Sequence, residues 1–96
     1  MKEITSKEFI DNKKDGVYVF HSSGCFTCEE HIKNMIEEFN HFFLIETSND
    51  IEYFESINIV LTPCTILYRN DIEIWRKQGA FYNKQINELR KEMYEL

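Results

Sequence analysis

Three cysteines carry the clearest chemistry in this sequence, and two of them, Cys25 and Cys28, are separated by only two residues. In a reducing compartment such a pair indicates redox chemistry or metal binding rather than a structural disulfide. The third cysteine, Cys64, directly follows the only proline of the chain, Pro63. The cysteine spacing therefore points to two chemistries, thiol–disulfide exchange and metal coordination.

The segment around the pair predicts how the chain presents it. Residues 17–20 are β-branched and aromatic, a run too short for a helix and suited to a buried strand, and residues 22–24 favour a turn. From Cys25 onward the apolar residues recur with helical spacing on one stripe. These residues are Ile32, Met35, Ile36 and Phe39. The pair is therefore predicted on the first turn of a helix that directly follows a strand.

A helix start changes the acidity of a thiol. The first turn has unpaired amide donors and a partial positive charge, which favour the thiolate of Cys25 and make it the attacking sulfur. Cys28 lies three residues further along, on the same helix face, so it can attack a mixed disulfide at Cys25 and release the partner. We predict Cys25 as the nucleophile and Cys28 as the resolving thiol.

The rest of the chain predicts an α/β domain. Thr5 and Glu8 have the spacing of a capping box, and Asn58 tolerates the left-handed conformation of a helix end. In chain order we first expect a helix after Thr5 that ends by Gly16, a strand over 17–20, the helix from Cys25 and a strand over 42–45. A helix from Asn49 or Asp50 and a hairpin of strands 64–68 and 72–75 follow. A closing helix begins at Asn83 and places Ile86, Leu89, Met93 and Leu96 on one face. Alternating elements predict a central four-stranded mixed sheet flanked by helices, in one domain over residues 1–96.

With this order and motif, nearly the whole chain resembles the thioredoxin family. Thr62 and Pro63 are similar to the family's cis-proline loop, which faces the cysteine pair, and Gly79 is similar to a glycine near the active face. The resemblance implies the thioredoxin fold and a thiol–disulfide oxidoreductase that reduces protein disulfides, with no bound cofactor. It also implies that Thr62 and Pro63 offer backbone groups to the substrate, and that a thioredoxin reductase or glutathione supplies the electrons.

The motif departs from the family pattern at several positions. The acidic residue that moves protons for the inner cysteine falls at Val19, so that role is vacant and Glu46 is a candidate substitute. Gly24 stands where the family has a tryptophan, and Phe26 and Thr27 replace Gly-Pro between the cysteines. The substrate surface and the redox potential are therefore not transferable from the family.

Local charge around the pair acts in opposite directions. Glu29 and Glu30 disfavour the Cys25 thiolate, whereas the helix start and a protonated His21 favour it. His21 is interpreted either as an ordinary histidine at a strand end or as a proton donor. Cys64 is either a buried strand residue or a thiol that exchanges with the pair.

Several side chains have simpler interpretations. Phe26, Val60 and Leu61 are predicted to form an apolar rim that receives an extended substrate. His31 is predicted at the solvent-exposed helix surface, and His41 near the end of the same helix. Trp75 is assigned to the core.

Composition excludes several classes of partner. A net charge of −6 does not attract phosphate groups electrostatically, so nucleic acid and anionic membrane are not expected partners. No apolar run is long enough to span a membrane, and residues 1–16 are charged and lack the pattern of a signal peptide. We therefore expect a cytoplasmic location. The resemblance implies protein disulfides as substrates, and we expect a monomer. At 43% hydrophobic residues the chain can bury a core of its own.

Two other functions remain open on the sequence. The altered motif and the apolar Val19 are compatible with a thioredoxin-fold binding module that has no catalytic activity. A zinc or iron–sulfur protein would use Cys25, Cys28 and His31, together with either Cys64 or His21, because sulfur and imidazole are preferred zinc ligands.

Overall fold

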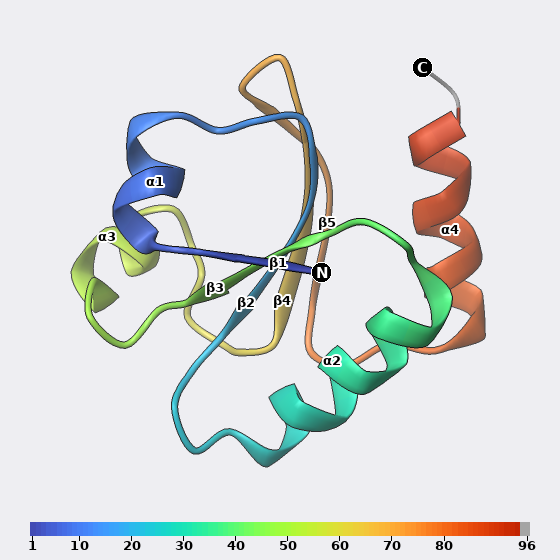
Figure 1. Ribbon diagram of the computed structural model, residues 1–96, viewed down its shortest axis with the longest axis horizontal. Helices are drawn as coiled ribbons and strands as arrows, with labels where there is room; N and C mark the ends of the chain where they lie inside the picture. The colour runs from blue at the N-terminus through green and yellow to red at the C-terminus, as the bar shows by residue number, and fades with distance from the viewer. Residues whose placement is uncertain (95–96) are drawn as a thin grey trace.

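The computed structural model describes residues 1–94 of the chain, and Figure 1 shows its nine elements. They are β1 (Lys2–Ile4), α1 (Ser6–Asp11), β2 (Gly16–His21), α2 (Phe26–Glu38), β3 (Phe43–Glu46), α3 (Ile51–Ser56), β4 (Cys64–Arg69), β5 (Ile72–Gln78) and α4 (Asn83–Tyr94). Leu96, which we predicted on the closing helix, lies outside the described residues.

The sheet is mixed, as predicted, but it has five strands in the order β1-β3-β2-β4-β5. β1, β3 and β2 run parallel, whereas β4 pairs antiparallel with both β2 and β5. The predicted fold class is therefore confirmed with one strand more than the four we expected. β1 escaped prediction because it has only three residues and exposes Lys2 and Glu3, so it carries no alternating pattern, and its partner β3 lies far along the chain.

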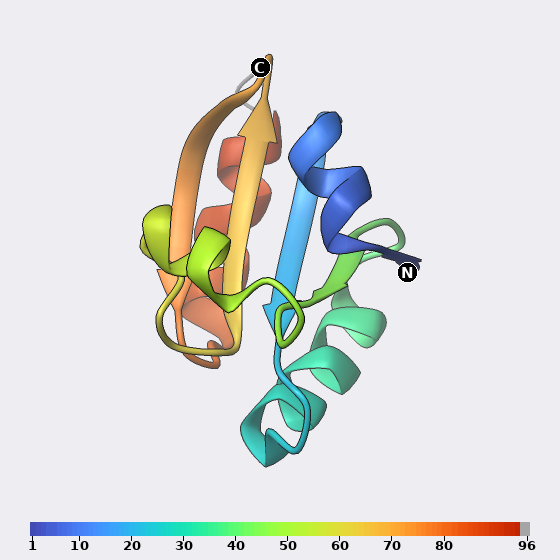
Figure 2. The ribbon, with the colours of Figure 1, turned by 90° about the vertical axis from the view of Figure 1, so that its left-hand side faces the viewer.

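Helices cover both faces of the sheet. Figure 1 views the sheet from its edge, with α1 and α3 on the left and α2 and α4 on the right, and Figure 2 turns the α1 and α3 side toward the viewer. Side chains of a strand alternate between faces, so β2 directs Tyr18 and Phe20 to one side and Val17 and Val19 to the other. This alternation produces two separate cores.

The two cores differ in composition. We call the first the α1–α3 core; its buried members are Phe9, Tyr18, Phe20, Ile45, Phe54, Ile59, Cys64, Ile66 and Tyr68. We call the second the α2–α4 core; its buried members are Val17, Val19, Met35, Phe39, Phe42, Leu44, Leu67, Phe81, Ile86 and Leu89. One is rich in aromatic rings and the other largely aliphatic.

Local signals explain where α1 and the hairpin form. Thr5 Oγ1 accepts the Glu8 amide at 3.1 Å and Glu8 Oε1 accepts the Thr5 amide at 3.3 Å, which completes the predicted capping box. At the β4–β5 turn Asn70 and Asp71 have φ of 53° and 66°, the conformation that tight hairpin turns require. Asn58 ends α3 with φ of 64°, also as predicted.

Three expectations about α2 are wrong. Ile36, placed on the apolar stripe, is 52% exposed, whereas His31, placed at the surface, is 2% exposed. The buried stripe therefore runs through Cys28, His31 and Met35. α2 ends at Glu38, so His41 lies beyond the helix.

The end of the chain follows the prediction more closely. Trp75 is partly buried and packs edge-on against Phe81 at 5.6 Å between ring centroids. α4 buries Ile86 and Leu89 against the α2–α4 core. Among residues 1–94, no helix combines the length and the apolar character that crossing a membrane would require.

Candidate active site

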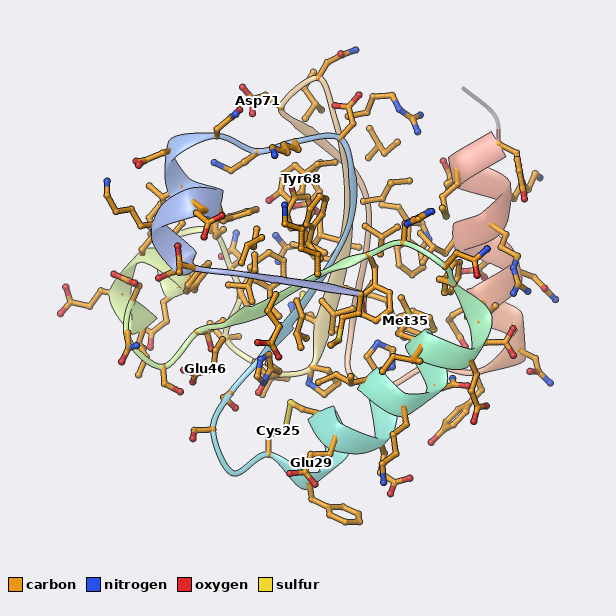
Figure 3. The ribbon with its side chains drawn as sticks, viewed as in Figure 1. Cys25, Glu29, Met35, Glu46, Tyr68 and Asp71 are labelled. Carbon is orange, nitrogen blue, oxygen red and sulfur yellow. A yellow bond between two sulfur atoms is a disulfide. The ribbon has the colours of Figure 1, made fainter. Side chains whose placement is uncertain are left out.

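The two motif cysteines lie where β2 passes into α2. Cys25 is the N-cap residue with an extended backbone, φ −87° and ψ 102°, and Cys28 lies on the first turn. A disulfide joins them, with their Cα atoms 5.2 Å apart, and Figure 3 shows it at the end of α2 nearest the β2 exit. Cys25 is partly exposed, whereas Cys28 is 1% exposed. One sulfur therefore faces solvent and the other lies behind it.

Polar groups converge on the sulfur of Cys25. Cys25 Sγ accepts the amide of Cys28 at 3.2 Å, the hydrogen bond that an N-cap side chain makes to the third helical residue. Thr62 O and Thr62 Oγ1 each lie 3.8 Å from the same sulfur. Thr62 Oγ1 also lies 2.7 Å from Ser22 Oγ, which links the loop before β4 to the loop before α2. The Cys25 sulfur thus lies among hydrogen-bonding groups from two segments.

The loop opposite the cysteines contains the cis peptide bond Thr62–Pro63. The Pro63 carbonyl accepts the Gly79 amide at 2.7 Å, which ties this loop to the end of β5. Within residues 1–94 no hydrogen bond engages the Thr62 amide. The backbone of Thr62 is therefore the part of the loop that remains open to a ligand beside Cys25.

The predicted apolar rim is exposed. Phe26 is 72% exposed directly after Cys25, and Val60 and Leu61 are 65% and 64% exposed just before Thr62. Because Thr62 contacts Cys25 Sγ, the apolar side chains flank this sulfur from both segments. Large hydrophobic side chains left in water around one polar center are typical of a docking surface.

Two carboxylates follow the cysteine pair on α2. Glu29 and Glu30 are exposed on the first turns of α2, and Figure 3 shows Glu29 beside Cys25. These negative charges oppose the helix start, which favours a thiolate at Cys25. The two predicted influences on the thiol are therefore both present.

The two other candidate modulators, His21 and Glu46, are cross-strand neighbours at the ends of β2 and β3. Burial lowers the pKa of His21, against the opposing effect of Glu46, so the imidazole is neutral at neutral pH. A hydrogen bond from Ser48 lowers the pKa of Glu46, which is a carboxylate at neutral pH. His21 therefore adds no positive charge at pH 7, and Glu46 is bonded to its own loop.

Cys64 is fully buried in the α1–α3 core, on the sheet face away from α2. Its cross-strand partner Phe20 belongs to the same core. Burial raises the pKa of the Cys64 thiol to about 11, so it is protonated at neutral pH. The structure therefore supports the simpler of our two interpretations, a buried strand residue.

His31, predicted at the solvent-exposed helix surface, is buried instead. Its Nε2 lies 2.9 Å from Thr65 Oγ1 on β4, and its ring packs edge-on against Phe81 at 4.6 Å between centroids. Burial lowers the pKa of His31 to about 4. A signal was present in the sequence, because His31 lies three residues after Cys28 and four before Met35, on the stripe that faces the sheet.

The metal alternative lacks a ligand cluster. Among the residues that the structure describes, no group of three or more His, Cys, Asp or Glu side chains is arranged to hold a metal ion. Cys64 faces the α1–α3 core, whereas Cys28 and His31 lie on α2 across the sheet. The ligand set suggested by the sequence is therefore not brought together.

Comparison with known proteins assigns the fold. No protein-family model matches the sequence, and no curated protein matches it significantly. Among solved structures, a poplar thioredoxin h has a TM-score of 0.83 at 20% identity, covering 99% of this chain and 97% of that one. Thioredoxin f2 of Chlamydomonas reinhardtii has a TM-score of 0.79 at 16% identity, covering 96% and 95%. The chain therefore has the thioredoxin fold, as the resemblance implied.

Proposed function

We propose that the protein is a thiol–disulfide oxidoreductase that reduces protein disulfides through Cys25 and Cys28. The observation that carries the proposal is the arrangement of the two sulfurs. A partly exposed sulfur caps a 13-residue helix, and a buried sulfur one turn further is close enough to form a disulfide with it. The thioredoxin fold of the chain supports the same chemistry.

The first step is attack by Cys25. In the dithiol form its thiolate is stabilised by the Cys28 amide and by the positive end of the α2 dipole. The thiolate attacks one sulfur of a substrate disulfide, so a bond forms between Cys25 and that sulfur while the substrate S–S bond breaks. The other substrate sulfur leaves as a thiolate and takes a proton from solvent.

The second step is resolution by Cys28. Its thiol loses a proton, and its sulfur attacks Cys25 Sγ, which breaks the mixed disulfide. The second substrate sulfur leaves as a thiol, and the protein ends with the Cys25–Cys28 disulfide seen in Figure 3. Two electrons pass from the protein dithiol to the substrate.

Substrate binding falls to the loop before β4 and the apolar rim. The open Thr62 amide donates a hydrogen bond to the backbone of an extended substrate segment, while Pro63 fixes the loop through its carbonyl bond to Gly79. Phe26 and Leu61 contact apolar side chains on either side of the substrate disulfide. This arrangement favours protein disulfides over small-molecule disulfides as substrates.

Turnover requires a reductant for the protein disulfide. A thioredoxin reductase or glutathione supplies these electrons. We propose a cytoplasmic setting, because net reduction of substrates needs a reducing compartment. We also propose that the protein is a monomer. No resident cofactor takes part in the steps above.

A redox titration tests the proposal directly. The protein is equilibrated in glutathione buffers of stepped potential, its free thiols are alkylated, and the modified cysteines are counted by mass spectrometry. We expect Cys25 and Cys28 to titrate together as a two-electron couple, with a reductase-like midpoint of about −270 mV. A midpoint between about −180 and −120 mV would instead indicate an oxidant or isomerase. Failure of the two to titrate as a pair would reject the oxidoreductase function.

Single variants separate the roles of the cysteines. Cys25→Ser abolishes reduction of insulin disulfides, whereas Cys28→Ser accumulates mixed disulfides at Cys25. Cys64→Ala is the matched control, because this cysteine faces the other core, and it keeps wild-type turnover. Robust turnover by Cys25→Ser would contradict the assignment. Partner capture that survives loss of both motif cysteines would favour the binding module, for which the apolar Val19 is the supporting observation.

A further inference from the structure

Buried polar side chains are rare in this protein. Among residues 1–94 three polar side chains are buried, His31, Thr47 and Thr65. Thr47 is satisfied locally, because its hydroxyl donates to the His21 carbonyl at 3.1 Å. His31 and Thr65 instead pair across α2 and β4, with Nε2 and Oγ1 2.9 Å apart. A polar pair therefore lies between the cysteine helix and the sheet.

This pair lies next to Cys28. His31 follows Cys28 by three residues, and residues at that spacing are neighbours on a helix surface. Side chains on a helix lean toward its N-terminus, so the His31 ring is directed toward the turn that carries Cys28. Both side chains belong to the buried stripe of α2. Thr65 pairs in register with Val19, which is apolar, so the β2 partner supplies no ionisable group to this pair.

One nitrogen of His31 lacks a partner. Nδ1 is buried and makes no hydrogen bond within the described residues. A neutral imidazole has one donor and one acceptor nitrogen, so when Nε2 donates to Thr65 Oγ1, Nδ1 keeps a free lone pair. Burial lowers the pKa of His31 to about 4, which keeps the ring neutral at pH 7. In that tautomer the disulfide form holds an unused proton acceptor one turn from the resolving cysteine.

We propose that His31 accepts the proton of the Cys28 thiol during resolution of the mixed disulfide, and that Thr65 orients the ring for this transfer. The inference rests on the proposed oxidoreductase function. As the Cys28–Cys25 bond forms and the bond from Cys25 to substrate breaks, the proton moves from Cys28 Sγ to His31 Nδ1. Because burial disfavours the imidazolium, the proton then passes to the departing substrate thiolate or to solvent, and no other reactant is needed.

His31 also borders the protein surface. His31 lines a surface cleft of about 330 Å³ between α2 and the segment after β5. Ionisable groups on the packed elements are Glu30, Lys33 and Glu37 on α2, Tyr82 after β5, and Lys77, the β5 partner of Thr65. These groups stay constant in the variants below, so they affect wild type and variants equally.

The test measures the two chemical steps separately. Reduced protein is mixed with a peptide disulfide, quenched with acid at successive times, and the mixed disulfide at Cys25 is quantified by mass spectrometry. In His31→Phe, an aromatic ring still faces Phe81 but both nitrogens are gone. We expect resolution to slow by about a hundredfold at pH 7, the lower end of the usual contribution of a positioned base, while formation of the mixed disulfide changes less than about twofold.

The pH profile separates proton transfer from packing. Without a base, resolution depends on the Cys28 thiolate fraction, so the rate in His31→Phe rises about tenfold per pH unit below the thiol pKa. The wild-type profile is flatter over the same range. Thr65→Val, which keeps the side-chain shape but removes the hydroxyl, slows resolution by a smaller factor. Thr47→Val is the matched control, since it removes a buried hydroxyl bonded to the His21 carbonyl, and it leaves resolution unchanged.

A measurement on the unmutated protein completes the test. Nitrogen-15 NMR of the His31 ring is compared between the dithiol and disulfide forms, and we expect the Nδ1 shift to change because Nδ1 accepts the thiol hydrogen only in the dithiol. An unchanged Nδ1 shift, or equal resolution rates in wild type and folded His31→Phe at every pH, would overturn the inference. If wild type forms no mixed disulfide at all, the proposed function fails instead.

Discussion

The two faces of one sheet bury different chemistry. On the α1–α3 side, Phe9 makes edge contacts with Tyr18, Phe20 and Tyr68 at centroid distances of 5.2, 5.2 and 5.6 Å. On the α2–α4 side the packing is mostly aliphatic, and the buried imidazole of His31 lies on the sheet-facing side of the helix that carries the cysteine pair. The α1–α3 core is built from apolar and aromatic side chains, whereas the α2–α4 side combines apolar packing with a buried imidazole next to the cysteine pair.

The two buried cysteines show what this difference means for reactivity. Cys28 and Cys64 are 1% and 0% exposed, so burial alone does not distinguish them. Cys28 lies behind a partly exposed sulfur and one turn from an imidazole, whereas Cys64 lies among aromatic and aliphatic side chains. Neighbouring groups, rather than burial, therefore distinguish the thiol to which we assign chemistry from the one to which we assign none.

The largest expected effect on stability comes from removing a ring of the α1–α3 core. Phe9→Ala removes the ring at the center of the α1–α3 core and leaves a cavity, so we expect a loss of about 3–5 kcal/mol in the free energy of unfolding. Urea denaturation measures this loss. Phe26→Ala, at a 72% exposed position, is the matched control and changes stability by less than about 0.5 kcal/mol. A similar loss in both variants would show that the aromatic core does not carry the stability assigned to it.

The second prediction concerns the pH dependence that the polar face introduces. The folded-state pKa of His31 is about 4, below its ordinary value of 6.5, so between these values the unfolded chain binds more protons. Protonation of His31 therefore does not affect the free energy of unfolding above pH 6.5. As the pH falls toward 4, it lowers the free energy of unfolding by roughly 3 kcal/mol in all.

Comparison of wild type with His31→Phe isolates this effect. The difference in unfolding free energy between the two proteins should change in favour of the variant as the pH is lowered from 6.5 to 4, measured by urea denaturation at each pH. Carboxylates and the other histidines contribute equally to both proteins and cancel. A difference that stays constant over this range would show that His31 is not desolvated in the folded protein.

The smallest expected effect is a difference in alkylation between the thiols of Cys25 and Cys64. Reduced native protein treated with iodoacetamide at pH 7 should be modified at Cys25 first, while Cys64 stays unmodified until denaturant is added. The reason is that Cys64 is fully buried and its pKa is raised to about 11, whereas alkylation requires an accessible thiolate. Peptide mass spectrometry at successive times locates the label. Modification of Cys64 at the rate of Cys25 would contradict its placement in the α1–α3 core.

Local signals were sufficient for much of the fold. The capping box of Thr5 and Glu8, the short apolar runs of β2 and β3 and the helical spacing after Cys25 each depend on residues close in sequence. The same signals failed where the partner was distant. β1 is too short to be recognised without β3, and His31 was assigned to solvent because histidine is polar, although its spacing to Cys28 and Met35 placed it on the buried stripe.

The sequence by itself determined that Cys25 and Cys28 open a helix after a strand, because both cysteines and their capping geometry belong to one short segment. Only the tertiary structure brought Thr62 to the Cys25 sulfur and Thr65 to His31, across 37 and 34 residues. It also decided which core receives Cys64. Strand side chains alternate between faces, so these outcomes depend on the register of β4 against β2, which is set by packing of the whole sheet rather than by any local pattern.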